Sequence, residues 1–531
     1  MTVLRNPVIR GFAPDPSLIR VGDWYYVATS SFEWFPTIPI HRSRDLAHWE
    51  YAGHVRGAAP GGTLSGVPDS GGIWAPSLSW DGKRFWVVYS VVRSIGTPYF
   101  DQDTYVTTAT DVAGPWTSPR RVASHGFDPA LFHEGGRLWL LNLQNDHRPG
   151  GRRFAGIVLT ELNRETLTPI GGTRLLLQHE RLLEGPKLTA HGGWYHLILA
   201  EGGTGFEHGV RTARSRSISG PYELDEHPLL TARDDPKSPL QKAGHAELVE
   251  TPDGAWFMSH LTSRPLDTAQ GPRCTLGRET AIQALVWDAQ GRPRLRTGGW
   301  HPSVDVDGPT PSAASPHRAV RHDALGWPWS TLRESPDPSW ADLVSRPGWI
   351  RLRGRHGPES RWAQSLLAQR ITEHCATAYV TVQAAPTTFT QAAGLILRYD
   401  AEAYISLELT WAEPAAEPQR GQQWHSAGRT VLSLVERDER GARQAAVVDV
   451  DARAPITLGV TVDGTEARFW HGPPSGARTP VGPPMDAGRL SDDHGGKLRF
   501  TGTLAGIHAR DLVDACFTAD FRHFRLTCRE R

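Results

Sequence analysis

The sequence has few cysteines and no excess of either charge. Its four cysteines stand far apart and form no CxxC pair, so neither a zinc site nor a disulfide framework is expected, and a reducing compartment suits the chain. Lysine plus arginine and aspartate plus glutamate both total 57, which makes the formal net charge zero. This balance favours neither a nucleic acid nor an anionic membrane as partner. We therefore expect an uncharged partner.

Long apolar runs are absent as well. No stretch of about 18 apolar residues occurs in the 531 residues, so no transmembrane helix is expected. The residues from Met1 to Pro7 contain no apolar core of signal-peptide length, which predicts a cytoplasmic protein. Tryptophan, by contrast, is abundant at 20 residues. Flat aromatic faces suit the apolar faces of sugars, although packing inside the fold explains most of these rings more simply.

A short pattern that ends in leucine recurs five times in the first 250 residues. The five anchor leucines lie 60, 53, 57 and 60 residues apart, at Leu18, Leu78, Leu131, Leu188 and Leu248. A glycine turn and an aromatic run follow each leucine, and this pattern predicts a β-hairpin. A period of about 50 to 60 residues that holds one hairpin and room for two more strands is typical of a propeller blade. The sequence therefore predicts a five-bladed β-propeller.

In a propeller the first strand of each blade lines the central channel, so five equivalent strand starts converge at one mouth. The residues expected at this mouth are Asp15, Trp74, Asp128, Glu184 and His245. A lone Asp-Pro pair is more often a turn than a catalyst. A purely structural role, however, predicts similar residues in every blade, whereas here the scaffold positions repeat and the mouth positions differ. This contrast favours a functional site.

The amino-acid composition changes after residue 305. Prolines among small and polar residues predict a linker over 306–325, after a propeller over 1–305. From 326 to 531, short alternating strands follow one another without long helical patterns, which predicts a β-sandwich and an all-β protein. No group of carboxylates stands out in this second domain, so we expect it to support the first.

Three carboxylates meet at the predicted mouth, from Asp15, Asp128 and Glu184. Without metal-ligand spacing, such a group suits hydrolysis of a glycosidic bond, in which one acid protonates the leaving oxygen and one base activates water. The third carboxylate can tune the acid, because a nearby negative charge keeps a carboxyl group protonated near neutral pH. The residues alone do not assign the three roles.

Five motifs in order carry a resemblance to a known family, namely 6–17, Gly126 to Ala130, Glu184 to Lys187, Gly244 to Thr251 and Gly277 to Gln283. Together they resemble glycoside hydrolase family 43, and most of all its two-domain β-xylosidases. The resemblance covers the whole chain, because the region from about 325 onward is similar to the concanavalin-like β-sandwich of that group. It implies an inverting mechanism with Asp15 as general base, Glu184 as general acid and Asp128 as modulator of the acid's pKa and orientation.

The resemblance also implies binding residues. Phe32, Trp74 and Arg278 would contact the terminal xylose, and a phenylalanine of the sandwich would close the pocket, for which Phe500 is the candidate. His245 would lie on the propeller axis and hold water or, in some members, calcium. No other cofactor is implied.

Two positions depart from the pattern of that group. Glu247 stands where aspartate is common after Gly-His-Ala, and Asn145 stands where these xylosidases often carry tryptophan. The second departure puts aromatic stacking on the leaving sugar in question.

The leading hypothesis is an exo-acting, inverting enzyme that releases xylose from the non-reducing end of β-1,4-xylo-oligosaccharides. An inverting enzyme separates its acid and base by roughly 6.5 to 9.5 Å to leave room for water. An α-L-arabinofuranosidase, or an enzyme with both activities, is the nearest alternative because the two sugars present similar hydroxyl groups. A non-catalytic carbohydrate-binding propeller is the alternative from a different class. Self-association into a homo-oligomer stays open, since no interface motif is evident.

Overall fold

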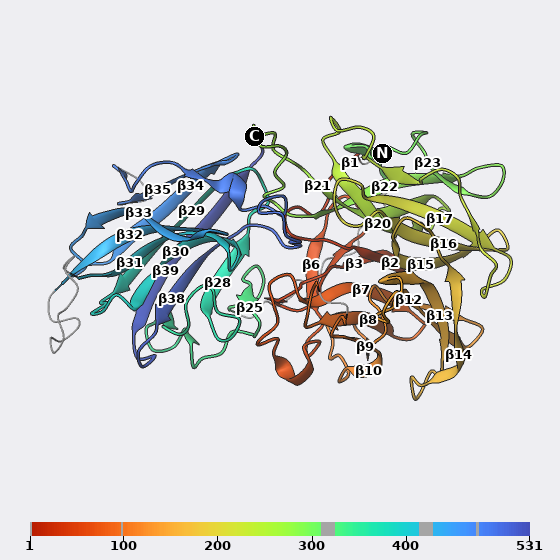
Figure 1. Cartoon of the computed structure of the whole chain (residues 1–531), viewed down its shortest axis with the longest axis horizontal. Helices are drawn as coiled ribbons and strands as arrows, with labels where there is room; N and C mark the ends of the chain where they lie inside the picture. The colour runs from red at the N-terminus through yellow and green to blue at the C-terminus, as the bar shows by residue number, and fades with distance from the viewer. Residues whose placement is uncertain (1–2, 97–98, 310–323, 414–427, 474–476) are drawn as a thin grey trace. The chain divides into compact units, whose positions relative to one another are not determined.

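The computed structural model describes residues 3–96, 99–309, 324–413, 428–473 and 477–531. Within these ranges every regular element is a β-strand except two short 3-10 segments, η1 (Pro60–Gly62) and η2 (Ala487–Arg489) (Figure 1). No helix in the described ranges is long and apolar enough to cross a membrane. The predicted all-β class is confirmed.

The chain forms two compact units. The first comprises Met1–Pro265 and Arg278–His322, and the second comprises Leu266–Gly277 and Asp323–Arg531. The assignment of Leu266–Gly277 to the second unit was not expected, because this short segment connects two strands of the first unit and has no distinct composition. Of the predicted linker over 306–325, residues 310–323 lie outside the described residues.

The first unit contains five antiparallel sheets, which are the five blades of the predicted propeller. This prediction is confirmed. The first blade consists of β2 (Ser17–Val21), β3 (Trp24–Ala28), β5 (Pro39–Ser43) and β6 (Glu50–His54), and the second of β7 (Gly72–Trp80), β8 (Phe85–Val92), β9 (Gln102–Ala109) and β10 (Arg120–Ala123). The third consists of β11 (Ala130–Glu134), β12 (Arg137–Asn145), β13 (Phe154–Leu162) and β14 (Pro169–Leu177). The fourth consists of β15 (Leu183–His191), β16 (Trp194–Glu201), β17 (Gly209–Ser215) and β18 (Glu223–Leu224), with β19 (Leu230–Thr231) also paired to β17. The fifth consists of β20 (Gln241–Glu250), β21 (Trp256–Ser263), β22 (Glu279–Trp287) and β23 (Pro293–Leu295).

The five inner strands form a closed ring, in which β2 neighbours β7, then β11, β15, β20 and β2 again. The start of the chain is joined to the segment that follows the last blade, because β1 (Val3–Arg5) pairs with β24 (Asp305–Asp307). The side chain of Asn6 strengthens this junction. Its Nδ2 donates to the carbonyls of Ile282 at 2.7 Å and Ser303 at 2.9 Å, and its Oδ1 accepts from the Ile282 amide at 2.8 Å.

The second unit is the predicted β-sandwich, which is also confirmed. One sheet has the order β28 (Ser365–Arg370), β38 (Leu504–Asp511), β30 (Gln391–Asp400), β31 (Ala403–Ala412), β32 (Arg429–Asp438) and β33 (Gly441–Asp449). The other has the order β26 (Ala341–Asp342), β27 (Ile350–Arg353), β39 (Thr518–Arg529), β29 (Cys375–Ala384), β34 (Ile456–Asp463), β35 (Glu466–His471) and β36 (Thr479–Pro480), with β37 (Met485–Asp486) beside β35. Two further short strands are β4 (Trp34–Phe35) in the first unit and β25 (Thr331–Leu332) in the second.

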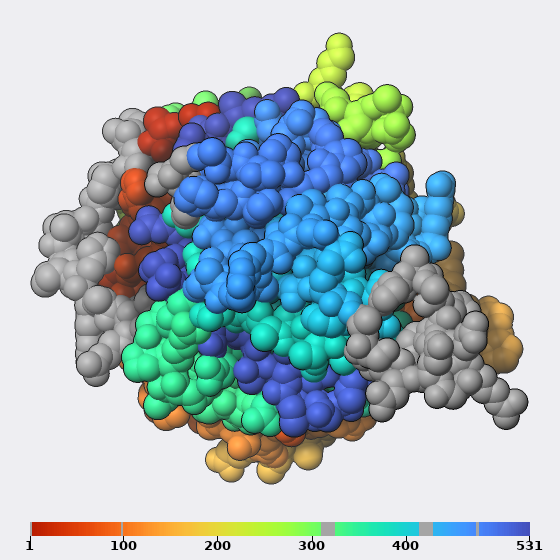
Figure 2. Space-filling view, turned by 90° about the vertical axis from the view of Figure 1, so that its left-hand side faces the viewer, coloured from red at the N-terminus to blue at the C-terminus, as the bar shows by residue number. Residues whose placement is uncertain are grey.

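The sandwich has one continuous apolar core between its sheets. Alternate residues of the central strands point inward, such as Val380 and Val382 of β29 and Leu395 and Leu397 of β30. The period of two that predicted these strands therefore also selects the residues that the two sheets bury against each other. Figure 2 shows this unit face on, with its described residues in green, teal and blue.

Candidate active site

The leucine-anchored repeat has the same backbone conformation in every blade. The residue three places before each leucine has a positive φ, with Asp15 at 55°, Ala75 at 31°, Asp128 at 52°, Gly185 at 56° and His245 at 53°. Residues other than glycine rarely adopt this left-handed conformation, which costs roughly 1–3 kcal/mol and concentrates at functional sites. The repeat is therefore a backbone turn at the mouth as well as a sequence pattern.

A register shift accompanies this turn in three blades. It lies between Trp74 and Ser77, between Glu184 and Lys187, and between Gly244 and Glu247. Bulges of this kind re-aim a side chain at the end of a strand. The blades can therefore place different residues at the mouth while their leucines keep one scaffold.

Asp15 lies in the most polar part of the mouth. Its Oδ2 accepts a hydrogen bond from Ser30 Oγ at 2.6 Å, and its Oδ1 accepts one from Arg278 Nη1 at 3.3 Å. His245 Nδ1 is 3.7 Å from the same Oδ1. Burial alone would raise the pKa of Asp15, but Arg278, His245 and the Ser30 hydrogen bond outweigh it, and the pKa is lowered. Asp15 is therefore ionised at neutral pH.

The pKa values of Asp128 and Glu184 are shifted in the opposite direction, upward. Burial and the negative charge of Asp15 raise the pKa of Asp128 to about 7. Burial, followed by the charges of Asp128 and Asp15, raises the pKa of Glu184 well above its usual range. Asp128 Oδ2 accepts a hydrogen bond from the amide of Gly185 at 3.0 Å, directly beside Glu184. The mouth thus holds one ionised carboxylate together with a carboxyl group that keeps its proton near neutral pH.

Aromatic rings line the mouth next to these carboxyl groups. Neighbouring ring centroids lie 5.6 to 6.3 Å apart in the series Phe12, Phe32, Trp74, Phe127 and Phe100. Trp74 is fixed by a hydrogen bond from its Nε1 to the carbonyl of Ser70 at 2.9 Å. The Arg278 guanidinium lies 5.6 Å from the centre of the Phe32 ring. The predicted binding residues Phe32, Trp74 and Arg278 are thus brought together beside Asp15. We call this series of rings the aromatic wall.

Two buried histidines complete the mouth, of which only His245 was predicted. Burial lowers the pKa of His245 to about 4 and that of His208 to about 3, so both rings are neutral at pH 7. Glycines make room for them. A Cβ on Gly185 would lie 3.1 Å from the His245 ring, and one on Gly244 would lie 2.1 Å from the His208 ring. The glycine-rich stretch before His208 is the sequence feature from which its place at the mouth could have been predicted.

The unusual Glu247 has a structural role beneath the mouth. Its Oε2 accepts hydrogen bonds from Ser17 Oγ at 2.6 Å and from the Leu18 amide at 3.0 Å. Lys187 Nζ is 3.6 Å from the same oxygen. Because these residues come from the first, fourth and fifth inner strands, the contacts of Glu247 connect three blades.

The side chain of Asn145 likewise makes structural hydrogen bonds inside the fold. Its Oδ1 accepts from Gln102 Nε2 at 2.7 Å, and its Nδ2 donates to the carbonyl of Arg153 at 2.9 Å. The side chain is buried, and Asn145 lies opposite Phe154 in the pairing of β12 with β13. Aromatic surface in this region therefore comes from Phe154 and Phe100 rather than from residue 145.

Comparison with known proteins identifies the family. The profile of glycosyl hydrolases family 43 matches residues 4–293, and that of the β-xylosidase C-terminal concanavalin A-like domain matches residues 321–527. The chain belongs to glycosyl hydrolases family 43. The predicted family is thus confirmed, and because its members act on glycosidic bonds, the substrate of this family 43 protein is a carbohydrate.

Relatives match along the full length of the chain. It is 37% identical to xylosidase/arabinosidase 43B of Humicola insolens, over 99% of this chain and 97% of that protein. It is 35% identical to a xylan 1,3-β-xylosidase of a Vibrio species, over 98% and 99%. The crystal structure of a xylan β-1,4-xylosidase from Bacillus halodurans C-125 superposes with a TM-score of 0.91 at 37% identity, covering 99% of this chain and all of the other.

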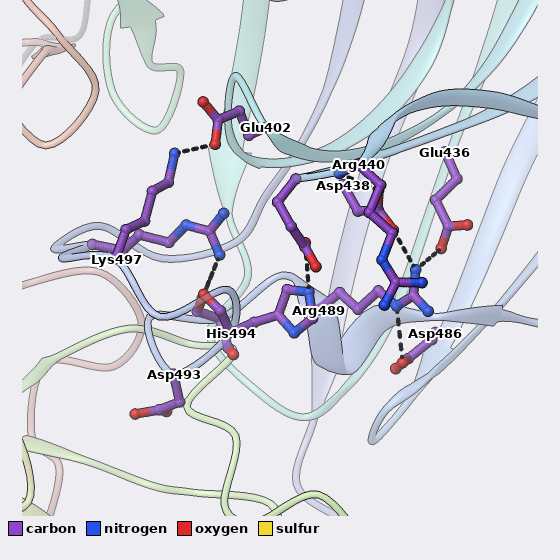
Figure 3. Close-up of polar contacts among 12 residues, drawn as sticks. Glu402, Glu436, Asp438, Arg440, Asp486, Arg489, Asp493, His494 and Lys497 are labelled. Atoms are coloured by element: carbon purple, nitrogen blue, oxygen red, sulfur yellow. Dashed lines mark hydrogen bonds and ion pairs between the residues drawn. The ribbon is translucent and has the colours of Figure 1, made fainter.

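Phe500, the predicted capping ring of this family 43 protein, belongs to the second unit and is buried. The preceding loop is held to the sandwich by ion pairs (Figure 3). Lys497 Nζ is 2.6 Å from Glu402 Oε2, and Arg489 Nη1 is 2.9 Å from Asp438 Oδ2. The segment that carries Phe500 is thereby fixed within its own unit. Its capping role stays a prediction.

Calcium near His245 was a further expectation. Calcium takes six to eight oxygen ligands, whereas the carboxylate beside His245 is that of Asp15, which already accepts hydrogen bonds from Ser30 and Arg278. These residues do not fit direct coordination of calcium. Among the described residues, the one group of three converging ligand atoms comes from Cys274, Asp492 and Asp493 of the second unit.

Proposed function

We propose that this protein is an exo-acting, inverting β-xylosidase that releases xylose from the non-reducing end of β-1,4-xylo-oligosaccharides. The observation that carries the proposal is the division of charge in the mouth. The pKa of Asp15 is lowered, while the pKa values of Asp128 and Glu184 are raised. Hydrolysis with inversion requires this combination of one base and one acid at the same pH. The xylosidase names of several relatives support the choice of sugar.

In the proposed mechanism, the Asp15 carboxylate removes a proton from water as the water oxygen attacks the anomeric carbon. The bond from that carbon to the leaving oxygen breaks, and Glu184 donates its proton to this oxygen. Asp128 keeps Glu184 protonated through its negative charge and fixes the neighbouring backbone through the Gly185 amide. Proton exchange with solvent restores both groups after the products leave.

The remaining mouth residues would bind the terminal sugar. The rings of Phe32 and Trp74 offer apolar faces to its C–H groups, and the Arg278 guanidinium offers fixed donors to its hydroxyl groups. Neutral His245 can donate or accept a hydrogen bond. Phe500 is proposed to cap the pocket. Since no step needs a metal ion, we expect that chelation of divalent cations leaves the rate unchanged.

The first test is a proton NMR time course with xylobiose, in which the anomer of xylose that appears before mutarotation is recorded. Because the bond cleaved is β, inversion predicts early α-xylose, which would establish xylosidase activity and inversion together. Early β-xylose would mean retention and overturn the roles of Asp15 and Glu184. Unconsumed xylobiose would overturn the xylosidase proposal.

Activity on α-L-arabinofuranosides is the second candidate function. It is favoured by the name of one relative, xylosidase/arabinosidase 43B. Rates on the 4-nitrophenyl glycosides of the two sugars distinguish a xylosidase, an arabinofuranosidase and an enzyme with both activities. We expect the xyloside to be the faster substrate.

A further inference from the structure

A basic cavity opens in the third and fourth blades of the first unit. Its volume is about 330 Å³, and its lining comes from the start of β13, the end of β14 and the loop into β15. The charged side chains of this lining are Arg152, Arg153, Arg181 and Glu180. The lining thus contains three guanidinium groups and one carboxylate. The formal charge of the lining is positive in a protein whose total formal charge is zero.

The arginines of the cavity are not all neutralised by neighbours. Arg181 pairs with Glu207 at 3.1 Å and lies 3.8 Å from Glu201. Among the described residues, no carboxylate lies within ion-pair distance of Arg152 or Arg153. The Arg153 guanidinium instead lies over aromatic rings. An aromatic face holds the plane of a guanidinium while its N–H groups stay available at the edge.

Arg153 stands at the outer end of the aromatic wall. Its guanidinium carbon is 4.8 Å from the centre of the Phe100 ring and 5.4 Å from that of Phe154. Both rings contact Phe127, at 5.8 and 6.1 Å, and Phe127 contacts Trp74 at 5.6 Å. The row of rings therefore continues from the proposed sugar site to the basic cavity without a break.

The cavity also lies beside the strand that carries the proposed acid. Leu183 belongs to its lining, and Glu184 is the next residue of β15. A general acid must contact the leaving oxygen, so the leaving group projects toward the blades that carry the acid. The proposed base, Asp15, comes from the first blade, away from this lining.

We propose that the basic cavity is a leaving-group subsite that favours substrates with a carboxylate on the leaving group, such as an oligosaccharide whose leaving xylose carries a uronic acid. This inference rests on the proposed xylosidase activity and deepens it. A planar carboxylate matches the two parallel N–H groups of a guanidinium. Neutral xylo-oligosaccharides are still accepted, because the aromatic wall contacts a sugar whether or not it is charged.

The test compares two aryl xylosides that differ in charge, 4-carboxyphenyl β-D-xyloside and its methyl ester. For each enzyme the ratio of kcat/KM on the acid to kcat/KM on the ester is measured, so that general effects on folding or on the acid Glu184 cancel. The variants are Arg153→Gln, Arg153→Glu and, as a matched control, Arg174→Gln, which removes an exposed arginine of β14 outside the cavity lining.

We expect the ratio to fall about three- to fivefold in Arg153→Gln, as for a partly exposed ion pair, and further in Arg153→Glu. The ratio of Arg174→Gln should equal that of the wild type. Raising the salt from about 0.02 M to about 0.5 M should lower the wild-type ratio toward that of Arg153→Gln, because ions screen the attraction.

Equal ratios in the wild type and both Arg153 variants would overturn the subsite, even if every enzyme cleaves the ester well. A failure of the wild type to cleave either xyloside would instead overturn the proposed xylosidase activity. The two failures are therefore distinguishable. Xylobiose with a uronic acid on its reducing xylose provides the natural counterpart, and we expect Arg153→Gln to slow its cleavage more than that of plain xylobiose.

Discussion

Three carboxyl groups share the mouth, and each has different neighbours. Asp15 is surrounded by donors and a guanidinium, whereas Glu184 faces two other carboxyl groups. At the scale of single residues, the proposed mechanism therefore depends on electrostatic surroundings rather than on residue type. A change to any one of the three groups should alter the others in a direction that can be worked out in advance.

Replacing Glu184 with alanine tests the proposed acid. We expect a loss of about 10²- to 10⁴-fold in kcat/KM on xylobiose, whose leaving sugar needs a proton. The loss on 4-nitrophenyl xyloside should be much smaller, because its leaving group departs without full protonation. Steady-state rates on both substrates measure the difference. Small and equal losses would remove Glu184 as the acid and favour a binding role for the mouth.

Replacing Asp128 with asparagine tests the proposed modulator. Activity requires protonated Glu184, so it is lost as the pH rises through the pKa of that group. The charge of Asp128 raises this pKa, and its removal should move the alkaline limb of the kcat/KM profile to lower pH. Profiles on 4-nitrophenyl xyloside measure the shift. The exposed carboxylate of Glu165 is a matched control, since Glu165→Gln should leave the limb in place.

At the scale of elements, each blade begins with the same left-handed turn, and the chain closes the ring of blades at its own start. The turn allows the mouth residues to differ while the anchor leucines stay the same. The closure depends on β1 and on the single side chain of Asn6, which reaches the backbone of two later segments. Propeller stability should therefore be sensitive to this one residue.

Replacing Asn6 with alanine should destabilise the first unit. The change leaves the amide and carbonyl of Ile282 and the carbonyl of Ser303 without the partner that Asn6 supplies. The Ser303 carbonyl keeps a hydrogen bond from Gln283 Nε2. The cost therefore comes from the two Ile282 groups, at about 1–3 kcal/mol each, and we expect a total of about 2–6 kcal/mol. Urea unfolding followed by tryptophan fluorescence measures it. Val3→Ala, at an exposed residue of β1, should change the midpoint little, and an equal effect of the two changes would contradict the role of Asn6.

At the scale of the whole molecule, we expect the buried Asp128 carboxyl group of the mouth to lower the free energy of unfolding at neutral pH. The pKa of Asp128 is raised to about 7 in the folded state, whereas it is near 4 in an unfolded chain. A group with a raised folded pKa contributes stability that is complete below its unfolded pKa and is lost as the pH rises through its folded pKa. The wild type should therefore lose stability between about pH 4 and pH 7 at this position.

Thermal unfolding of Asp128→Asn tests this cost. At pH 8 the variant should melt a few degrees above the wild type, because asparagine needs no proton to be buried. At pH 3 the two proteins should melt together, since Asp128 is then mostly protonated in both the folded and the unfolded state. Glu165→Gln is again the control and should follow the wild type at both pH values. A variant that melts below the wild type at pH 8 would contradict the raised pKa.

Much of this molecule could be predicted from its sequence, because the fold repeats. The five leucines, their glycine turns and their aromatic runs depend on local spacing, and this spacing specified the blades, the mouth and the residues Asp15, Asp128 and Glu184 at it. Alternation with a period of two specified the sandwich in the same way. Local patterns of this kind are visible to sequence reasoning because each element is determined by its own residues.

Other features depended on distances between residues far apart in the chain. Asp15 and Arg278 are 263 residues apart, so the low pKa of Asp15 exists only once the ring of blades is closed. His208 beside Gly244, the Lys187–Glu247 pair and the basic cavity arise in the same way, from elements that different blades contribute. Burial and Coulomb interactions act through space. The sequence by itself therefore determined that Asp15, Asp128, Glu184 and His245 meet at the mouth. Only the tertiary structure decided that His208 joins them, which of these residues are charged there and what surrounds them, because burial and Coulomb interactions depend on distances that the order of residues does not contain.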